Sequence, residues 1–207
     1  MKLYYSAGAC SLAPHILLNE TKLPVATERV DLASHTTAGG ADYYAVNSKG
    51  SVPVLVLEDG TTLTEGPIIA QFIADKAART DLMPAAGTLP RYKVMEWQNY
   101  VTSELHKFFS PLFRADFDAH GKDQLRAALR KKYEWVAQQL AGKDYLTGST
   151  FTAADAYLFT VTRWAPKVGV DLADLTALQD FMKRVAARPA VRTTLQTEGL
   201  LTDQQAA

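Results

Sequence analysis

Residues 1–10 read MKLYYSAGAC, a short apolar run that breaks through small residues into the only cysteine of the chain, Cys10. The aromatic part at 2–5 is typical of a β-strand, and the residues after Cys10 have the composition of a helix. Cys10 is therefore predicted to lie at the first turn of a helix, where unpaired backbone N–H groups and the helix dipole favour the thiolate. The alternative is a small buried side chain without chemistry, since free cysteine is among the most buried residue types.

The composition limits the classes of protein to which the chain can belong. It has 207 residues, of which 47% are hydrophobic, enough for one large domain or two modest ones. The 22 basic and 22 acidic residues give a formal net charge of zero, which argues against nucleic acid or an anionic membrane as the main partner. A charge near zero leaves self-association open.

No targeting or membrane-spanning segment is expected. Residues 7–10 superficially resemble a lipoprotein processing site, but the nine residues before the cysteine are too few for the apolar core of a signal peptide. No later run approaches the roughly 18 apolar residues of a membrane span. Because a lone cysteine excludes an intrachain disulfide, we expect a cytoplasmic protein.

The first 80 residues mix strand-like and helix-like runs. Helices are predicted after Cys10 and after Glu65, and Asp59-Gly60 is a hairpin signal between the last two strands. The strands are predicted at 2–5, 26–30, 54–58 and 61–64. A βαβ unit followed by a hairpin and a helix indicates an α/β domain at residues 1–80, with a small mixed sheet covered by helices.

The second half is predicted to be an all-α domain spanning residues 87–203. A Pro/Gly/Ala-rich stretch at 82–90 separates the halves, and strand signals nearly vanish after it. Thr152 and Asp155 have the spacing of a capping box. Residues 202–207 are expected to form a frayed tail. Helical periodicity covers 89–116, 122–141, 152–166 and 174–187.

Two short motifs in the first half suit a peptide-like ligand. Pro53 stands at the entry to a predicted strand, and the Val52-Pro53 bond is either cis or trans. The proline marks either a plain strand start or a sharp turn that leaves the Val52 backbone free to pair with an extended peptide. Glu65-Gly66 precedes Pro67, which suits the first position of a helix. The helix start would hold a ligand carboxylate while Glu65 takes an ammonium, unless Glu65 only complements the helix dipole.

A polar stripe follows the helix predicted at 89–116. At about 100° per residue, Asn99, Ser103 and His106 share one face, next to Lys107. This face either binds a polar ligand or is simply solvated. The opposite, apolar face carries Trp97, Val101, Leu105, Phe108 and Leu112. The other histidines have no metal-like spacing to one another or to Cys10, so no metal site is predicted at His15, His35 or His120.

Four motifs, in order along nearly the whole chain, resemble a bacterial beta-class glutathione S-transferase. They are MKLYYSAGACSLAPH at 1–15, NSKGSVPVL at 47–55, LTEGP at 63–67 and FTAADA at 151–156. The resemblance implies a thioredoxin-like N-terminal domain, an all-helical C-terminal domain, a homodimer and a cis bond before Pro53. In such a protein Pro53, Thr152 and Asp155 have structural roles.

The resemblance also implies a glutathione site. Cys10 would face the glutathione sulfur, Val52 would pair with the cysteinyl backbone, and Glu65 with Gly66 would hold the γ-glutamyl end. His106 would hydrogen-bond near the sulfur, and the residues around it, some of them across the dimer interface, would be Asn99, Ser103, Glu104, Leu105 and Lys107. Two positions depart from the family pattern. His35 replaces the usual lysine near the glycyl carboxylate, which removes charge assistance when the ring is neutral, and Gly66 replaces a frequent serine.

The implied activity is conjugation of the glutathione thiolate to small, largely apolar electrophiles for detoxification, with glutathione as co-substrate and no cofactor. The electrophile pocket would draw on helical residues such as Phe109, Phe113 and Trp164. One alternative is a glutathione-dependent thiol-disulfide reductase or reductive dehalogenase that uses Cys10. Because position 13 is alanine, any disulfide chemistry needs an external thiol. A second alternative is a non-catalytic adaptor with the same fold.

Overall fold

The computed structural model describes residues 1–201. These divide into two compact units, residues 1–80 together with the chain from 187, and residues 81–186. The predicted tail at 202–207, and with it the end of the domain predicted at 87–203, lies outside the described residues. Within the described part, no helix is long and apolar enough to cross a membrane.

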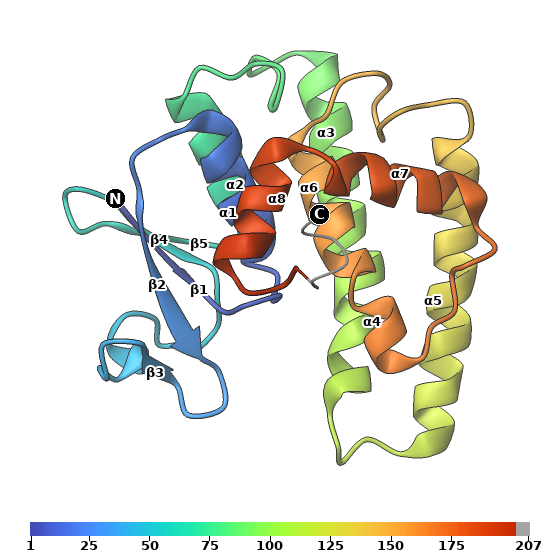
Figure 1. The fold of residues 1–207 in the computed structure, drawn as a ribbon, viewed down its shortest axis with the longest axis horizontal. Helices are drawn as coiled ribbons and strands as arrows, with labels where there is room; N and C mark the ends of the chain where they lie inside the picture. Colours follow the sequence, from blue (N-terminus) through green and yellow to red (C-terminus); the bar gives the residue numbers. More distant parts are fainter. Residues whose placement is uncertain (202–207) are drawn as a thin grey trace. The chain divides into compact units, whose positions relative to one another are not determined.

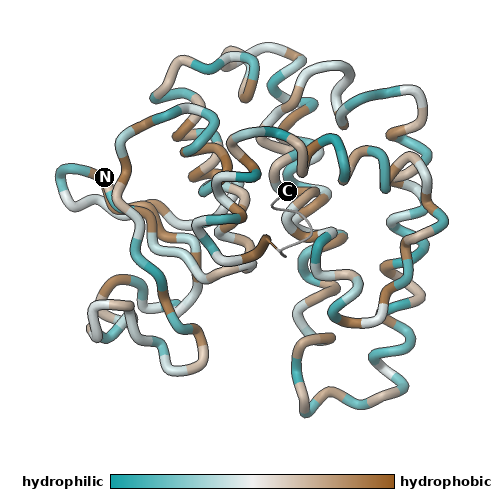
Figure 2. Tube along the Cα trace, in the orientation of Figure 1, coloured by the Kyte–Doolittle hydropathy of each residue, from teal (hydrophilic) through white to brown (hydrophobic). Residues whose placement is uncertain are grey.

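The first unit contains a five-stranded mixed sheet in the order β3-β2-β1-β4-β5. The central strand β1 (Lys2–Tyr5) runs parallel to β2 (Ala26–Asp31) and antiparallel to β4 (Val54–Val56). The hairpin predicted at Asp59-Gly60 joins β4 to β5 (Thr62–Thr64), and its polar turn is drawn in teal in Figure 2. The predicted βαβ unit and hairpin are confirmed. The two-residue edge strand β3 (Thr36–Thr37) is too short to show a period-2 pattern, so the sequence does not predict it.

Three helices complete this unit. The helix α1 (Leu12–Thr21) packs against both α2 (Gly66–Lys76) and α8 (Pro189–Thr197), as Figure 1 shows. The sequence reasoning missed α8 and placed 187–203 in the helical domain. Its signals were Pro189 at the first turn and the apolar pair Val191 and Leu195 one turn apart, both buried.

Side chains at both ends of α8 hold it on α1. Arg188 donates two hydrogen bonds to the Glu20 carboxylate, at 2.6 and 3.0 Å. The buried Glu198 carboxylate accepts the Gly8 N–H at 2.8 Å and lies 2.8 Å from Nδ1 of His15. One carboxylate therefore joins α1, α8 and the turn before Cys10.

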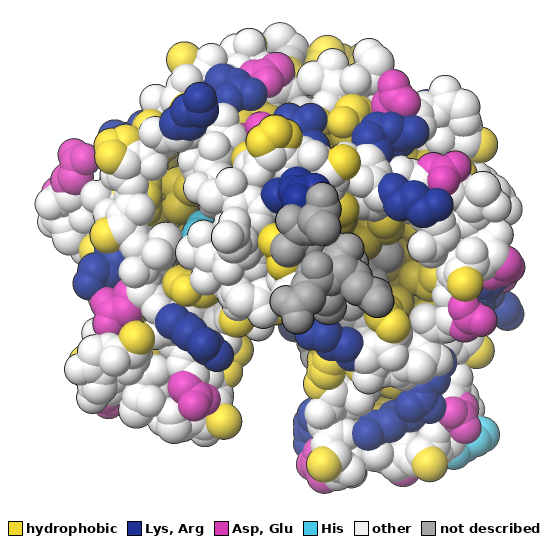
Figure 3. Space-filling model, viewed as in Figure 1, with side chains coloured by type: hydrophobic (Ala, Val, Ile, Leu, Met, Phe, Trp, Pro, Cys, Tyr) yellow, Lys and Arg dark blue, Asp and Glu magenta, His cyan; other side chains and the backbone are white. Residues whose placement is uncertain are grey.

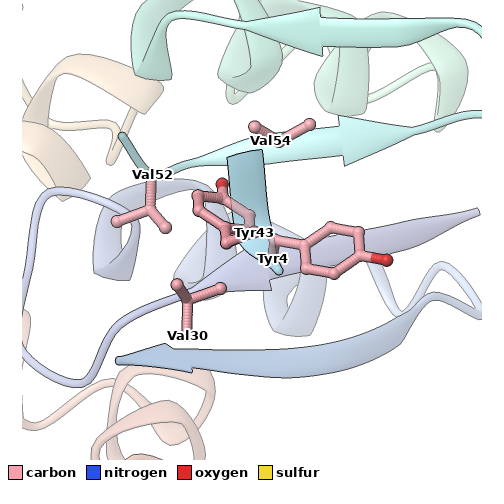
Figure 4. Packing of buried hydrophobic residues seen from close by; sticks show 5 residues of the cluster. All are labelled: Tyr4, Val30, Tyr43, Val52 and Val54. Atoms are coloured by element: carbon pink, nitrogen blue, oxygen red, sulfur yellow. The ribbon is translucent and has the colours of Figure 1, made fainter. Parts of the chain in front are cut away.

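A small core lies on one side of the sheet. Tyr4 and Val54 are opposite each other on β1 and β4, so their side chains point to the same face. The cluster, drawn in Figure 4, consists of Tyr4, Val30, Tyr43, Val52 and Val54. Tyr43 lies in the short helix η1 (Tyr43–Ala45), and its hydroxyl donates to the Ser51 carbonyl at 2.9 Å. This bond fixes the loop that leads into Val52.

The second unit is all helical. Its elements are α3 (Leu89–Tyr100), the π-helical turn η2 (Val101–His106), α4 (Lys107–Phe109), η3 (Ser110–Phe113), α5 (Ala119–Leu140), α6 (Ala153–Thr162), η4 (Ala165–Val168) and α7 (Thr176–Ala186). The helix α6 is buried along its whole length. Thr152 and Asp155 form a reciprocal capping box at its start.

The helix predicted as one regular run at 89–116 is broken in the middle. Two hydroxyls bond back to carbonyls one turn earlier, Thr102 to Gln98 at 2.8 Å and Ser103 to Asn99 at 3.1 Å. Such bonds compete with the regular helical ladder, and here the Lys107 N–H bonds to the Thr102 carbonyl, five residues back. Residues after the wide turn are therefore rotated relative to a 100° projection.

Candidate functional site

Cys10 lies in a tight turn, two residues before the first residue of α1. The Ser11 hydroxyl accepts the Ser6 N–H at 3.1 Å and donates to the Ser6 carbonyl at 3.2 Å, which closes this turn. The Cys10 thiol donates to the Val52 carbonyl at 3.2 Å. Two of the predicted site residues, Cys10 and Val52, are therefore in direct contact.

Burial raises the pKa of the Cys10 thiol to about 11. The backbone N–H groups of Cys10 and Ser11 lower the pKa and the Glu65 carboxylate raises it, but both effects are smaller than the desolvation of the thiolate. The helix start favours the thiolate as expected, but burial outweighs it, so the expectation of a lowered pKa is wrong for this site. Cys10 is a neutral hydrogen-bond donor near pH 7.

Alkylation of Cys10 by iodoacetamide tests this protonation state. With a pKa of about 11, the thiolate fraction at pH 7 is about 10⁻⁴, so the rate constant is expected to rise about tenfold per pH unit up to at least pH 10. Because the chain has one cysteine, mass spectrometry reports this site alone. N-acetylcysteine is the control, and a plateau of the protein rate between pH 7 and 9 would contradict the raised pKa.

The Val52-Pro53 peptide bond is cis. Strand β4 begins at Val54, so the N–H and C=O of Val52 lie outside the strand ladder. The Val52 side chain is buried in the cluster with Tyr4 and Tyr43, which fixes the direction of its backbone. An extended peptide that pairs with Val52 would continue the sheet pattern at this point.

Glu65 occupies the N-cap of α2 with a left-handed backbone, at φ 67°. This conformation is unfavourable for a residue with a Cβ, and such residues gather at functional sites. The Glu65 carbonyl accepts the N–H groups of Ile68 and Ile69, both at 3.0 Å, while its exposed carboxylate accepts Lys49 Nζ at 2.7 Å. The helix start therefore presents a carboxylate that already holds one ammonium.

Gly66 follows at the first position of α2. A Cβ built on Gly66 would lie 3.9 Å from Cγ of Pro53, an ordinary contact. Space does not require glycine here, so the departure from the family's serine removes a hydroxyl without relieving a clash. The same contact places the helix start directly beside the cis-proline.

The ring of His35 is packed against the loop that precedes Val52. It stacks on Tyr44 with ring centroids 4.5 Å apart, and a Cβ on Gly50 would come within 2.9 Å of His35 Nδ1. This Nδ1 is buried and has no hydrogen-bond partner in the part of the chain that the structure describes. His35 is therefore connected to the Cys10 and Glu65 region through the loop at Lys49-Gly50.

In the helical unit, His106 lies in an aromatic cluster. Its Nδ1 is 2.7 Å from the Tyr157 hydroxyl, and its ring meets Trp164 edge-on with centroids 4.9 Å apart. Phe109 and Phe113 also meet the Trp164 ring edge-on. Of the three aromatic residues expected near the electrophile, the two phenylalanines thus contact the tryptophan, which lies beside His106.

The other glutathione-site residues predicted on this helix lie in three environments. Asn99, Ser103 and Lys107 are exposed. Glu104 instead pairs with Lys132 of α5, whose hydrogen bond and charge lower the pKa of its carboxyl. The Leu105 side chain is fully buried, so it contributes packing and offers no side-chain surface to a ligand.

The apolar side of this helix also differs from the projection. Beyond the π-helical turn the fully buried residue is Phe109, whereas Phe108 is half-buried, with Lys132 Nζ 4.6 Å above its ring. The wider turn shifts every later side chain, which a constant 100° rule cannot anticipate.

Two residues of this region escaped the sequence reasoning. Lys49 stands inside a quoted motif, but nothing in the sequence indicates its pairing with Glu65. Tyr157 is far from His106 in sequence, and its position on α6 could have been found only from the packing of that helix on α3 and η2. Among residues 1–201, no group of three or more His, Cys, Asp or Glu side chains could hold a metal ion.

Comparisons with known proteins agree on one family. The N-terminal domain of glutathione S-transferases matches residues 7–76, and the C-terminal domain of the same family matches residues 100–189. Glutathione S-transferase GstA of Escherichia coli O157:H7 is 47% identical over 97% of this chain and 100% of the relative.

Two solved structures show the same family and fold. A sphingomonad glutathione S-transferase complexed with glutathione is 41% identical with a TM-score of 0.93, and a beta-class enzyme from Sphingomonas chungbukensis is 40% identical with the same score. Both comparisons cover 97% of this chain and 100% of the other.

Proposed function

Since this chain belongs to the glutathione S-transferase family, and within it resembles the bacterial beta class, we propose that it conjugates glutathione to small, largely apolar electrophiles. The observation that carries the proposal is the assembly of Cys10, Val52, cis-Pro53, Glu65 and Gly66 in the thioredoxin-like unit. Val52, Glu65 and Gly66 offer groups that match parts of a tripeptide thiol, and the cis bond before Pro53 has a structural role.

Glutathione would bind along the edge formed by Val52. Its cysteinyl backbone pairs with the Val52 N–H and C=O, as an added strand would. The γ-glutamyl ammonium takes the Glu65 carboxylate, and the adjacent α-carboxylate lies at the start of α2, where backbone N–H groups and the helix dipole favour an anion. The small Gly66 allows close approach to that helix start.

The helical unit would supply the groups for sulfur and electrophile. In this proposal, His106 donates toward the sulfur, and Asn99, Ser103, Glu104 and Lys107 contribute polar groups to a glutathione site, in part across a homodimer interface. Phe109, Phe113 and Trp164 offer apolar surface for the electrophile. Leu105 supports this helix from within the core.

The chemistry requires a thiolate on glutathione. The thiol loses its proton to solvent, the sulfur anion attacks the electrophilic carbon, a C–S bond forms and the leaving group departs with its electron pair. Hydrogen-bond donors aimed at the sulfur stabilise the developing anion. The neutral Cys10 thiol already donates its hydrogen bond to the Val52 carbonyl, and disulfide exchange would need the Cys10 thiolate and an external resolving thiol.

The wider setting is part of the same proposal. We assign residues 1–80 to glutathione binding and place the protein in the cytoplasm as a homodimer that detoxifies electrophiles. A net charge of zero and the interspersed basic and acidic side chains in Figure 3 offer little repulsion between copies. No nucleic-acid or membrane partner is proposed, because these side chains gather into no single-sign patch on the face shown.

Calorimetry with glutathione and turnover of a generic aryl halide test the function together. The wild-type protein is expected to bind glutathione and form the conjugate. Glu65→Gln is expected to weaken binding by about 1.5 to 3 kcal/mol, because it removes a charge-assisted bond to the ammonium.

Glu58→Gln, at an exposed turn of the same unit, is the matched control and should bind like the wild type. Binding without turnover would favour the adaptor, and disulfide reduction without conjugation would favour the reductase. Equal affinities of Glu65→Gln and wild type would remove Glu65 from the site.

A further inference from the structure

Lys49 is bonded to the Glu65 carboxylate, which is the proposed partner of the glutathione ammonium. Its Nζ donates to Glu65 Oε1 at 2.7 Å and to Thr64 Oγ1 at 3.0 Å. The side chains of Lys49 and Glu65 are 50% and 66% exposed, so water screens their attraction. This ion pair is weak enough for a ligand ammonium to replace Lys49 on Glu65.

A displaced Lys49 would carry an unpaired positive charge beside a bound ligand that has two carboxylates. Its flexible four-carbon side chain lets the ammonium move while the backbone stays in place. The backbone of the next residue, Gly50, lies against the His35 ring, at the position where the family's usual lysine would serve the glycyl carboxylate. Lys49 therefore connects the Glu65 end of the site to the His35 end.

His35 itself is poorly placed to replace that lysine. Its ring is stacked on Tyr44, and its buried Nδ1 faces the Gly50 backbone and not solvent. His35 also has a left-handed backbone, at φ 52°, and its carbonyl accepts the Tyr43 N–H at 2.8 Å, so both its backbone and its ring are held. Nδ1 of His35 is therefore not available to the glycyl carboxylate, whereas the ammonium of Lys49 is on an exposed side chain.

We propose that Lys49 is a glutathione-binding residue that leaves Glu65 when the ligand ammonium arrives and takes the glycyl carboxylate in place of the missing family lysine. This inference rests on the proposed function. It gives Lys49 two successive partners, an acidic side chain in the free protein and a ligand carboxylate in the complex. Breaking the Lys49–Glu65 ion pair costs little binding free energy, because an ion pair between exposed side chains contributes little.

Calorimetry with two ligands tests the assignment, using glutathione and its glycyl monoethyl ester, which lacks only the glycyl charge. Lys49→Met is expected to raise the Kd for glutathione about 5-fold at low salt and to leave the Kd of the ester unchanged. The difference should shrink in about 1 M salt, where the screening length falls to about 3 Å.

Three variants frame the result. Lys49→Arg keeps the charge and should bind glutathione like the wild type, and Lys76→Met removes an exposed lysine at the far end of α2 as a matched control. The double variant Lys49→Met/His35→Lys restores a cation at the family position and should regain affinity for glutathione but not for the ester.

Other outcomes overturn the assignment. Tighter binding of both ligands by Lys49→Met would make Lys49 only a competitor for Glu65, and equal weakening of both would place it at the γ-glutamyl end. Unchanged affinity for glutathione would exclude any contact. If the wild type binds neither ligand, the proposed function fails and the role of Lys49 fails with it.

Discussion

Replacing His106 with alanine is expected to lower kcat/KM for aryl-halide conjugation by about 100-fold, the usual scale for removing a well-placed donor to a developing anion. Nδ1 of His106 is 2.7 Å from the Tyr157 hydroxyl. If Tyr157 donates to Nδ1, the ring carries its proton on Nε2 and has a fixed orientation against Trp164. Tyr157→Phe keeps the imidazole but removes this orienting bond, so a smaller loss is expected.

Cys10→Ala gives the contrasting result in the same assays. Because the neutral Cys10 thiol donates its hydrogen bond to the Val52 carbonyl, its loss should leave much of the conjugating activity while abolishing mixed-disulfide formation with glutathione. Aryl-halide conjugation and disulfide reduction are measured side by side on both variants, with thermal unfolding to confirm the fold. Loss of conjugation in Cys10→Ala with full activity in His106→Ala would overturn the role assignment.

Asp155→Asn is expected to lower the free energy of unfolding by about 3 kcal/mol. The variant weakens the capping box, and it leaves a buried N–H or O–H donor facing the NH₂ group of asparagine, which cannot accept its hydrogen bond. The Asp155 carboxylate is fully buried and accepts three hydrogen bonds. One comes from the Leu146 N–H at 2.8 Å and two from Thr152, from its N–H at 2.8 Å and its hydroxyl at 2.7 Å. An amide has one acceptor oxygen, so its NH₂ group would face one of these donors.

Calorimetric or denaturant unfolding measures this loss, which corresponds to about 10 °C in Tm for a chain of this size. Asp118→Asn is the matched control. Asp118 caps α5 by accepting the Gly121 N–H at 2.8 Å on an exposed surface, and asparagine caps a helix as well as aspartate does. A similar Tm for the two variants would show that the buried hydrogen bonds of Asp155 do not hold α6.

Local signals in the sequence were sufficient where one residue type fits one conformation. Asp59-Gly60 predicted the β4–β5 hairpin, and Pro67 correctly indicated the start of α2. The short apolar run at residues 2–5 predicted the central strand. Only the family resemblance could place Val52 close to Glu65 and Gly66. These two segments are separated along the chain, and no local signal in the sequence indicates that they meet.

Features that depend on packing or desolvation were beyond the sequence. The π-helical turn at Val101–His106 is not indicated by the apolar periodicity, and beyond it Phe109 is fully buried whereas Phe108 is half-buried. The pKa of Cys10 follows from burial that composition does not report. The helix α8 shows a clear start signal, but its partner α1 is encoded at the other end of the chain.

The discontinuity of the first unit has a consequence for its biosynthesis. Residues 1–80 leave the ribosome long before residues 187–201 are made, yet the Gly8 N–H and the His15 ring both contact the Glu198 carboxylate. Domains usually fold as units during synthesis, in order from the N-terminus. Here the helical unit can complete its own contacts first, and the turn before Cys10 gains its contact with Glu198 only when the last helix emerges and docks on α1.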